Sequence, residues 1–252
     1  MDESRFACII VAGGSGQRFG GDKPKQFQDL NGYPVYIWSI CNALSSGYFS
    51  SLVVVAPATY IDKVQCDLDK YFAADSDKGK GPGAKTRLAV IAGGDSRQAS
   101  VFNGLQYLDG LAKDRPVNVI IHDAARPLAG PQYFQKCAET IEQFGACTIG
   151  LPVSDTIKSV ANTIITKTVD RSSLWSVQTP QGAPFDLLLG CHKDAAAGGI
   201  SVTDDAAILE AFAHPVRVFE GFTHNIKVTV ADDFKTCQLL APLYLSKSPM
   251  QP

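Results

Sequence analysis

Short apolar runs alternate with amphipathic segments through the first 150 residues, and this alternation restricts the fold more than any other feature of the chain. The β-branched run at 6–11 has the composition of a buried strand. Similar runs predict strands at 52–56, 88–92, 117–121 and 146–153, and helical spacing predicts helices at 37–44, 61–71, 101–108 and 133–144. Such alternation is typical of a parallel sheet with helices on both faces. We therefore predict an α/β fold with a doubly wound, mostly parallel, Rossmann-like sheet.

Residues 154–183 interrupt this rhythm. The segments 156–160 and 164–169 flank Ala161-Asn162-Thr163 and alternate in polarity, which predicts a β-hairpin. An isolated two-stranded hairpin has little stability of its own. We therefore expect an arm at 154–183 that protrudes from a single domain spanning 1–252 and lies against a second subunit of a homodimer. After the arm the pattern predicts helices at 184–197, 204–213 and 232–245, with a strand at 216–219.

The first predicted strand runs into the glycine-rich turn 12–16. Glycines allow a tight turn and a close approach to a ligand, and their N–H groups can converge on phosphate oxygens. Arg18, Lys23 and Lys25 follow within eight residues. Glycines alone would fit a plain connection equally well, but the added cations favour a phosphate site.

The common phosphate motifs are incomplete here. A dinucleotide fingerprint fits at Gly14 and Gly16 but fails at Phe19, which disfavours an NAD-dependent oxidoreductase. A P-loop is excluded because Asp22 and Lys23 stand where it requires Lys followed by Ser or Thr.

Composition excludes several classes of protein. The net charge of −2 disfavours nucleic acid as a partner, so an anion site must come from a local cluster. No apolar run reaches the roughly 18 residues of a membrane span, and residues 1–5 lack the layout of a secretory signal. The seven cysteines include no C-x-x-C pair, which favours a reducing cytoplasm. The four histidines lack metal-ligand spacing, and we expect them to be structural or solvated.

Three polar segments follow predicted strands: the glycine-rich turn, Gly93-Gly94-Asp95 and His122-Asp123. Ligands of parallel sheets bind beyond the carboxyl ends of the strands, so we expect the three to share one site. Asp204 and Asp205 open a predicted helix, and we assign them to its N-terminus alone.

A series of motifs runs in order from Ile9 to about Leu239. They are Ala-Gly-Gly-Ser-Gly-Gln-Arg at 12–18, Pro-Lys-Gln at 24–26, Gly-Gly-Asp-Ser-Arg-Gln-Ala-Ser-Val at 93–101, His-Asp-Ala-Ala-Arg-Pro at 122–127, Asp-Thr-Ile-Lys at 155–158, Val-Asp-Arg at 169–171, Gln-Thr-Pro-Gln at 178–181, Thr-Asp-Asp at 203–205 and Asn-Ile-Lys-Val-Thr at 225–229. In this order the chain resembles the 2-C-methyl-D-erythritol 4-phosphate cytidylyltransferases of non-mevalonate isoprenoid biosynthesis. It also resembles their relatives, the ribitol-5-phosphate cytidylyltransferases. Val169-Asp170-Arg171 with Leu174-Trp175 looks more like the first group.

The resemblance implies a reaction of CTP with a sugar-alcohol phosphate that yields a CDP-alcohol and pyrophosphate, in a nucleotidyltransferase-type fold. It implies Mg²⁺ on the phosphate oxygens, with Asp123 as the nearest candidate ligand. The catalytic cations that it implies are Arg18, Lys25, Arg171 and Lys227. The nucleotide-binding residues are Ala12, Gly13, Gly14, Gly16, Gly94, Asp95 and Ser100. The substrate-binding residues are Asp123, Arg126 and Thr156, and the resemblance has Thr156 and Arg171 reach into the neighbouring subunit.

The implied chemistry needs no general base, because the second pKa of a phosphate monoester is about 6 and the nucleophile is largely ionised at neutral pH. The difficulty is the repulsion between two anions, which fixed cations relieve. A catalytically inactive nucleotide-binding module is the alternative from another class. Loss of Arg18 or Lys25 would mark such a module, and both residues are present.

Overall fold

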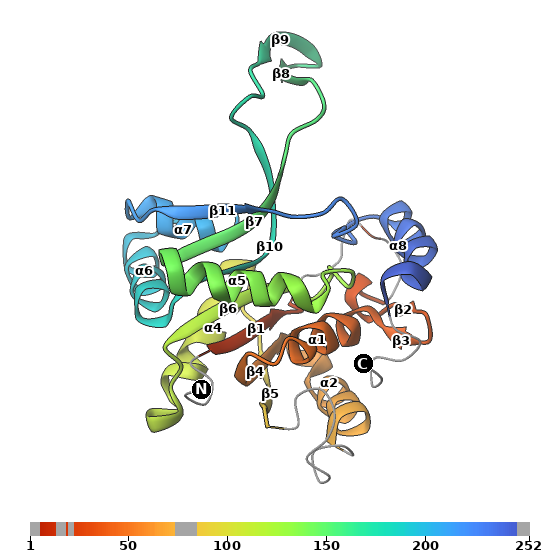
Figure 1. Ribbon diagram of the computed structural model, residues 1–252, viewed down its shortest axis with the longest axis vertical. Coiled ribbons are helices and arrows are strands. Elements are labelled where there is room, and N and C mark those ends of the chain that lie inside the picture. Colours follow the sequence, from red (N-terminus) through yellow and green to blue (C-terminus); the bar gives the residue numbers. More distant parts are fainter. Residues whose placement is uncertain (1–5, 14–18, 20–22, 74–84, 246–252) are drawn as a thin grey trace.

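The central feature of the molecule is a seven-stranded, mostly parallel sheet with strand order β11-β7-β10-β6-β1-β4-β5 (Figure 1). The structure is a computed structural model that describes residues 6–13, 19, 23–73 and 85–245. Arg18, Gly14 and Gly16 of the predicted site lie outside the described residues.

The elements follow one another along the chain in the predicted alternation. The strands are β1 (Phe6–Val11), β2 (Asp29–Leu30), β3 (Tyr33–Pro34), β4 (Phe49–Ala56), β5 (Arg87–Ala92), β6 (Asn118–Asp123), β7 (Ala146–Pro152), β8 (Ile157–Ala161), β9 (Ile164–Val169), β10 (Trp175–Pro184) and β11 (Val216–Glu220). The α-helices are α1 (Val35–Ser45), α2 (Ile61–Leu68), α4 (Arg97–Asp109), α5 (Pro131–Phe144), α6 (Phe185–Gly198), α7 (Asp205–Ala211) and α8 (Ala231–Tyr244). Short helical turns are η1 (Lys25–Phe27), η2 (Ala58–Tyr60), η3 (Asp69–Ala73) and η4 (Ala112–Asp114).

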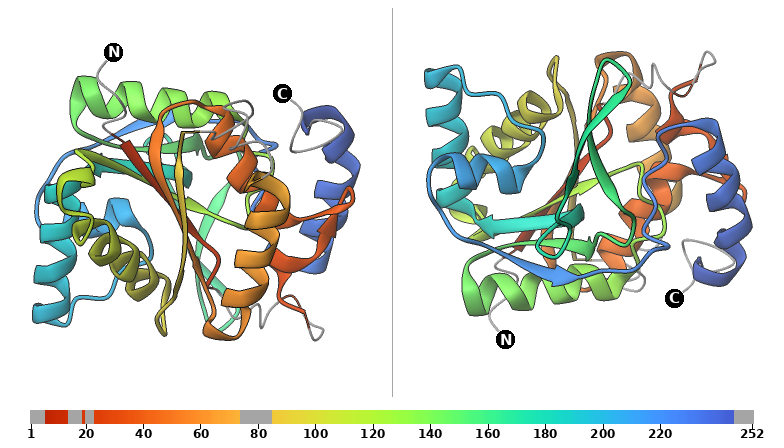
Figure 2. Two further views of the ribbon diagram at one scale, coloured as in Figure 1. Left: turned by 90° about the horizontal axis from the view of Figure 1, so that it is seen from below. Right: turned by 90° about the horizontal axis from the view of Figure 1, so that it is seen from above.

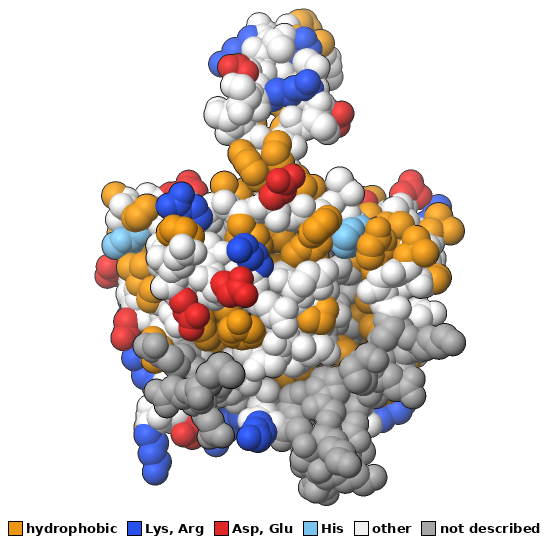
Figure 3. Space-filling view, in the orientation of Figure 1, with side chains coloured by type: hydrophobic (Ala, Val, Ile, Leu, Met, Phe, Trp, Pro, Cys, Tyr) orange, Lys and Arg blue, Asp and Glu red, His pale blue; other side chains and the backbone are white. Residues whose placement is uncertain are grey.

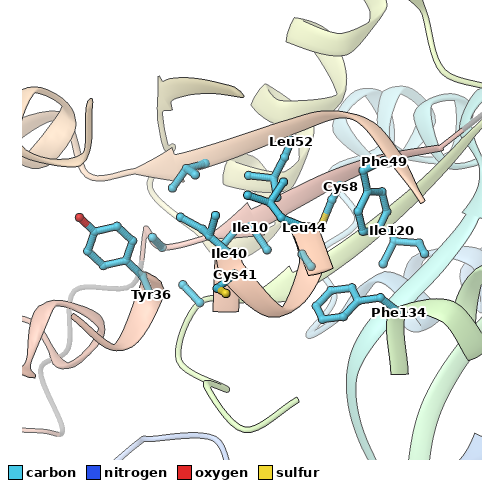
Figure 4. Packing of buried hydrophobic residues seen from close by; sticks show 14 of the residues in the cluster. Cys8, Ile10, Tyr36, Ile40, Cys41, Leu44, Phe49, Leu52, Ile120 and Phe134 are labelled. Atoms are coloured by element: carbon cyan, nitrogen blue, oxygen red, sulfur yellow. The ribbon is translucent and has the colours of Figure 1, made fainter. Parts of the chain in front are cut away.

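Helices cover both faces of the sheet, as predicted (Figure 2). Successive side chains of a strand point to opposite faces, so β1 contributes to two cores. Cys8 and Ile10 pack in one core with residues of α1, α2 and α5 (Figure 4), and Ile9 packs in the other with residues of α4, α6 and α7. Every residue of β1 is buried, which explains why its sequence is an unbroken apolar run.

The sequence analysis did not predict β10, which inserts between β6 and β7 and runs antiparallel to both. Its pattern is hidden because Pro180 and Gly182 are poor strand formers. A Cβ on Gly182 would lie 2.7 Å from the Val119 carbonyl oxygen and 2.6 Å from Ile141 Cδ1. Glycine is therefore required where β10 passes close to β6 and α5.

Only the first part of the predicted arm 154–183 protrudes, because its last residues belong to β10 in the sheet (Figure 1). The projecting hairpin pairs β8 with β9 and exposes the apolar side chains of Val160, Ile164 and Ile165. Hydrophobic side chains also gather at the base of the arm (Figure 3). At the start of β10, Trp175 and Val177 are 37 and 40% exposed. The hairpin thus carries apolar surface that its own chain does not cover.

Within the described ranges, no helix is both long and apolar enough to cross a membrane. All seven cysteines lie in those ranges and are free thiols, six of them buried.

Candidate functional site

The carboxyl ends of four neighbouring strands meet at one edge of the sheet. The Ala12 N–H donates to the Val55 carbonyl oxygen (2.8 Å), and the Ala124 N–H donates to the Val11 carbonyl oxygen (3.0 Å). The Gly93 N–H donates to the Ala56 carbonyl oxygen (2.8 Å). These bonds bring the start of the glycine-rich turn, the Gly93-Gly94 turn and Asp123 to the same edge, as the sequence predicts.

A pocket of about 290 Å³ opens at this edge. Its lining is Val11, Ala12, Lys25, Gln26, Arg97, Asp123, Ala125 and Lys227. Ala12, Lys25, Asp123 and Lys227 are predicted site residues, and they come from four separate segments of the chain. Gln26 Nε2 donates to the Ala12 carbonyl oxygen at 2.6 Å and so ties η1 to the end of β1. The pocket therefore presents two lysines and an arginine around one buried carboxylate.

Asp123 is the electrostatic centre of the pocket. Its Oδ1 accepts a hydrogen bond from Arg97 Nε at 2.9 Å, and its Oδ2 lies 2.6 Å from Lys227 Nζ. Burial would raise the pKa of this carboxyl, but the charges of Arg97, Lys227 and Arg126 outweigh burial and hold the pKa well below its usual range. Asp123 is therefore ionised at neutral pH and fixes the cations around it.

Arg97 is the main site residue that the sequence analysis missed. It lies in the Gly-Gly-Asp-Ser-Arg motif, but nothing in that motif distinguishes an exposed arginine from a pocket arginine. It opens α4, and its Nη2 donates to Asp205 Oδ2 at 2.8 Å. Burial lowers the pKa of Arg97, but Asp205 and Asp123 outweigh it and raise that pKa. The guanidinium thus joins two carboxylates from β6 and α7.

The two aspartates that open α7 differ in role. The Asp204 side chain accepts from the Ala207 N–H at 2.9 Å and caps the helix, as predicted, and its second oxygen accepts from Gln181 Nε2 of β10 at 2.9 Å. The assignment of Asp205 to the helix terminus alone is wrong, because its buried carboxylate pairs with Arg97. A sequence pattern cannot reveal this contact, since the partners are 108 residues apart.

Ser100 organises the predicted cytosine-binding turn. Its Oγ donates to the Ser96 carbonyl oxygen at 2.8 Å and accepts from the Gly94 N–H at 3.2 Å. A Cβ on Gly13 would lie 2.9 Å from this Oγ, and a Cβ on Gly94 would lie 2.6 Å from the Ala99 Cβ. Ser100 and the two glycines therefore pack together, whereas Asp95 is exposed at the rim.

Buried hydrogen bonds hold the backbone of Asp123 in place. The Thr179 hydroxyl accepts from the Asp123 N–H and donates to His122 Nδ1, each at 3.0 Å, while His122 Nε2 donates to the Arg126 carbonyl oxygen. Burial lowers the pKa of His122 to about 3, so this histidine is neutral and structural. Arg126 Nη1 donates to the Asn225 carbonyl oxygen at 2.7 Å. Arg126 is 9% exposed and is not among the residues that line the pocket.

Two predicted residues lie on the arm, away from this pocket. Thr156 and Arg171 are exposed, and the Arg171 guanidinium donates to the Ser154 carbonyl oxygen. Neither residue lines the pocket of its own chain.

The pocket offers limited ligands for a metal ion. Over the described part of the chain, no group of three or more His, Cys, Asp or Glu side chains could hold one. Among the described residues, Asp123 is the single carboxylate that lines the pocket, and the Lys227 ammonium competes for its Oδ2. Magnesium typically uses one or two carboxylates together with substrate phosphates and water. The residues therefore fit Mg²⁺ that draws most of its ligands from phosphate oxygens.

Comparison with known proteins agrees with this geometry. Residues 6–242 match the family of 2-C-methyl-D-erythritol 4-phosphate cytidylyltransferases. The chain belongs to this family. The cytidylyltransferase of that name from Synechococcus elongatus is 38% identical over 233 residues, which cover 92% of this chain and 94% of the relative. The one from Synechococcus sp. strain WH7803 is 40% identical over 226 residues, or 89% of this chain and 94% of the relative.

Solved structures of the cytidylyltransferase family share the fold. The Thermus thermophilus enzyme is 26% identical, with a TM-score of 0.70, and the match covers 96% of this chain and all of that chain. A structure from Anaerococcus prevotii reaches a TM-score of 0.78 at 23% identity with the same coverage, and this likeness bears on the fold alone. The resemblance and the α/β architecture predicted from the sequence are thereby confirmed.

Proposed function

We propose that the protein is a cytidylyltransferase that converts CTP and 2-C-methyl-D-erythritol 4-phosphate into the CDP-alcohol and pyrophosphate in isoprenoid biosynthesis. Membership of the family, whose relatives carry this name, supports the proposal. The pocket lysines Lys25 and Lys227 support it further, because fixed cations suit a reaction between two phosphorylated molecules.

In the proposed reaction a phosphate oxygen of the alcohol phosphate attacks the α-phosphorus of CTP. The new bond joins that oxygen to the phosphorus, the bond between the α-phosphorus and the bridging oxygen breaks, and pyrophosphate leaves with the electron pair. No proton has to be removed from the nucleophile at neutral pH. Lys25 binds the triphosphate and stabilises the charge that grows on the leaving group, while Lys227 binds the phosphate of the alcohol. Arg18 belongs with Lys25 in this role by family resemblance.

The backbone at Ala12 and Gly13 binds the nucleotide phosphates, and the turn at Gly94, with Asp95 and Ser100, receives the cytosine. Glycine at position 94 lets this turn pack closely on α4, because a Cβ there would lie 2.6 Å from the Ala99 Cβ. Asp123 binds no phosphate itself but orients Lys227.

We further propose that Mg²⁺ is the cofactor, held by phosphate oxygens and by Asp123. When bound, the ion neutralises charge on the phosphates.

The arm favours a homodimer with shared sites as the working form. Val160, Ile164 and Ile165 expose 57, 69 and 61% of their surface, which a second subunit would cover. In that arrangement Thr156 and Arg171 bind the alcohol phosphate at the partner's pocket. Seven free cysteines support a reducing cytoplasm as the site of action.

Pyrophosphate release tests the proposed function. The full chain is incubated with CTP and magnesium and with either 2-C-methyl-D-erythritol 4-phosphate or ribitol 5-phosphate. We expect turnover with the first alcohol and at least a hundredfold lower kcat/KM with the second. Turnover of ribitol phosphate alone would overturn the substrate, and turnover of neither would overturn the activity. The same assay compares the wild type with Lys25→Ala. Lys136→Ala, which removes an exposed lysine of α5, is the control for that variant.

A further inference from the structure

We propose that Arg97 and Asp205 form a positioning pair, which restrains the Asp123 carboxylate so that Lys227 stays available to the phosphate of the alcohol substrate. This inference rests on the proposed function. It concerns two residues that do not themselves carry the reaction.

The first observation is the fork made by the Arg97 guanidinium. Nε contacts Asp123 Oδ1 at 2.9 Å, and Nη2 contacts Asp205 Oδ2 at 2.8 Å. The side chains of Arg97, Asp123 and Asp205 are 22, 8 and 3% exposed, respectively. A planar guanidinium can hold two partners in fixed directions, which an ammonium group cannot do. Arg97 therefore sets where Asp123 Oδ1 points.

The second observation is that Asp205 is itself fixed. Gln181 Oε1 accepts from the N–H groups of Asp205 and Ala206 at 2.9 and 3.0 Å, and Gln181 Nε2 donates to Asp204 Oδ2 at 2.9 Å. Gln181 belongs to β10, so the start of α7 is anchored to the central sheet. Asp205 thus provides a rigid support on the far side of Arg97.

The third observation is that the Lys227 ammonium contacts the other oxygen of the Asp123 carboxylate. Because Arg97 occupies Oδ1, the Lys227 ammonium contacts Oδ2 at 2.6 Å. The Lys227 side chain is 39% exposed, so its charge lies where the pocket meets solvent. Without Arg97 both carboxylate oxygens could turn toward this ammonium. The phosphate of the substrate would then compete with a stronger counter-ion.

The test compares the steady-state kinetics of Arg97→Met and Arg97→Lys with the wild type. With CTP saturating, we expect Arg97→Met to raise KM for 2-C-methyl-D-erythritol 4-phosphate at least tenfold, while KM for CTP changes less than threefold. Arg97→Lys keeps the charge but not the fork, so we expect an intermediate KM. Asp205→Asn, which retains Arg97, should change KM in the same direction.

Arg115→Met is the matched control. Arg115 also forks between two carboxylates, those of Asp109 and Asp186, but it does not line the pocket. We expect this variant to keep both KM values of the wild type. Equal effects of Arg97→Met and Arg115→Met would overturn the inference.

A double-mutant cycle separates positioning from a merely structural role. If Arg97 acts through Lys227, Arg97→Met should change kcat/KM less than twofold in a Lys227→Ala background. An effect as large as in the wild type, or a parallel fall of kcat with both KM values unchanged, would overturn the inference. If Arg97→Met does not fold, Asp205→Asn takes its place in the cycle. Turnover by the wild type in the same assay tests the proposed function separately.

Discussion

Replacing Asp123 by asparagine should destabilise the protein in a pH-dependent way. The substitution removes the negative charge shared by Arg97 at 2.9 Å, Lys227 at 2.6 Å and Arg126 at 4.0 Å. Breaking a buried ion pair on one side leaves charge uncompensated and costs about 3 kcal/mol or more. We therefore expect the free energy of unfolding of Asp123→Asn at pH 7 to be about 3 kcal/mol below that of the wild type.

The sign of the pH dependence follows from the lowered pKa of Asp123 in the folded protein. The unfolded chain takes up the proton first, near pH 3.9, so the stabilising contribution is complete above that pH and is lost as the pH falls. Between pH 5 and pH 3 the difference between wild type and Asp123→Asn should shrink by about 1.2 kcal/mol.

Urea denaturation at pH 7, 5 and 3 measures this difference directly. Asp62→Asn, which removes an exposed carboxylate of α2, is the control, and its difference from the wild type should vary less with pH. A difference for Asp123→Asn that stays constant from pH 7 to pH 3 would refute the electrostatic account of the pocket.

Three further variants test other parts of the proposal. Lys25→Ala should lower kcat by about two to three orders of magnitude, as expected for losing one preorganised charge donor, and a loss below tenfold in pyrophosphate release would remove Lys25 from its role. Arg171→Ala should raise KM for the alcohol phosphate, while CTP should still raise the melting temperature of the variant. If mixed dimers are active only when Arg171 and Lys25 belong to the same chain, the proposal that Arg171 acts at the partner's pocket is wrong. Gly94→Ala should raise KM for CTP because its Cβ would lie 2.6 Å from the Ala99 Cβ, and Ala99→Gly should restore binding; no rescue would contradict the packing account.

Local patterns were sufficient to predict most of the fold. The apolar runs of β1, β4 and β6 are fully or almost fully buried strands, and such runs have few alternatives. β10 was not predicted because its antiparallel insertion is decided by long-range pairing, while its own sequence carries Pro180 and Gly182. The arm was predicted too long for the same reason.

The residues of the candidate site also differ in how far the sequence predicts them. Lys25 was predicted as one of three cations that closely follow the glycine-rich turn, and Asp123 because it follows a predicted strand. Lys227 was predicted because the family resemblance implies it. Arg97 and Asp205 were missed, since their roles depend on contacts between segments far apart in the chain.

The account depends most on where the phosphates of CTP bind. A crystal structure of the full chain with CTP and magnesium measures this directly. We predict that the triphosphate lies over Ala12 and Gly13, with Lys25 in contact with its oxygens. A triphosphate bound away from Lys25, with the pocket around Asp123 left to solvent, would contradict the account.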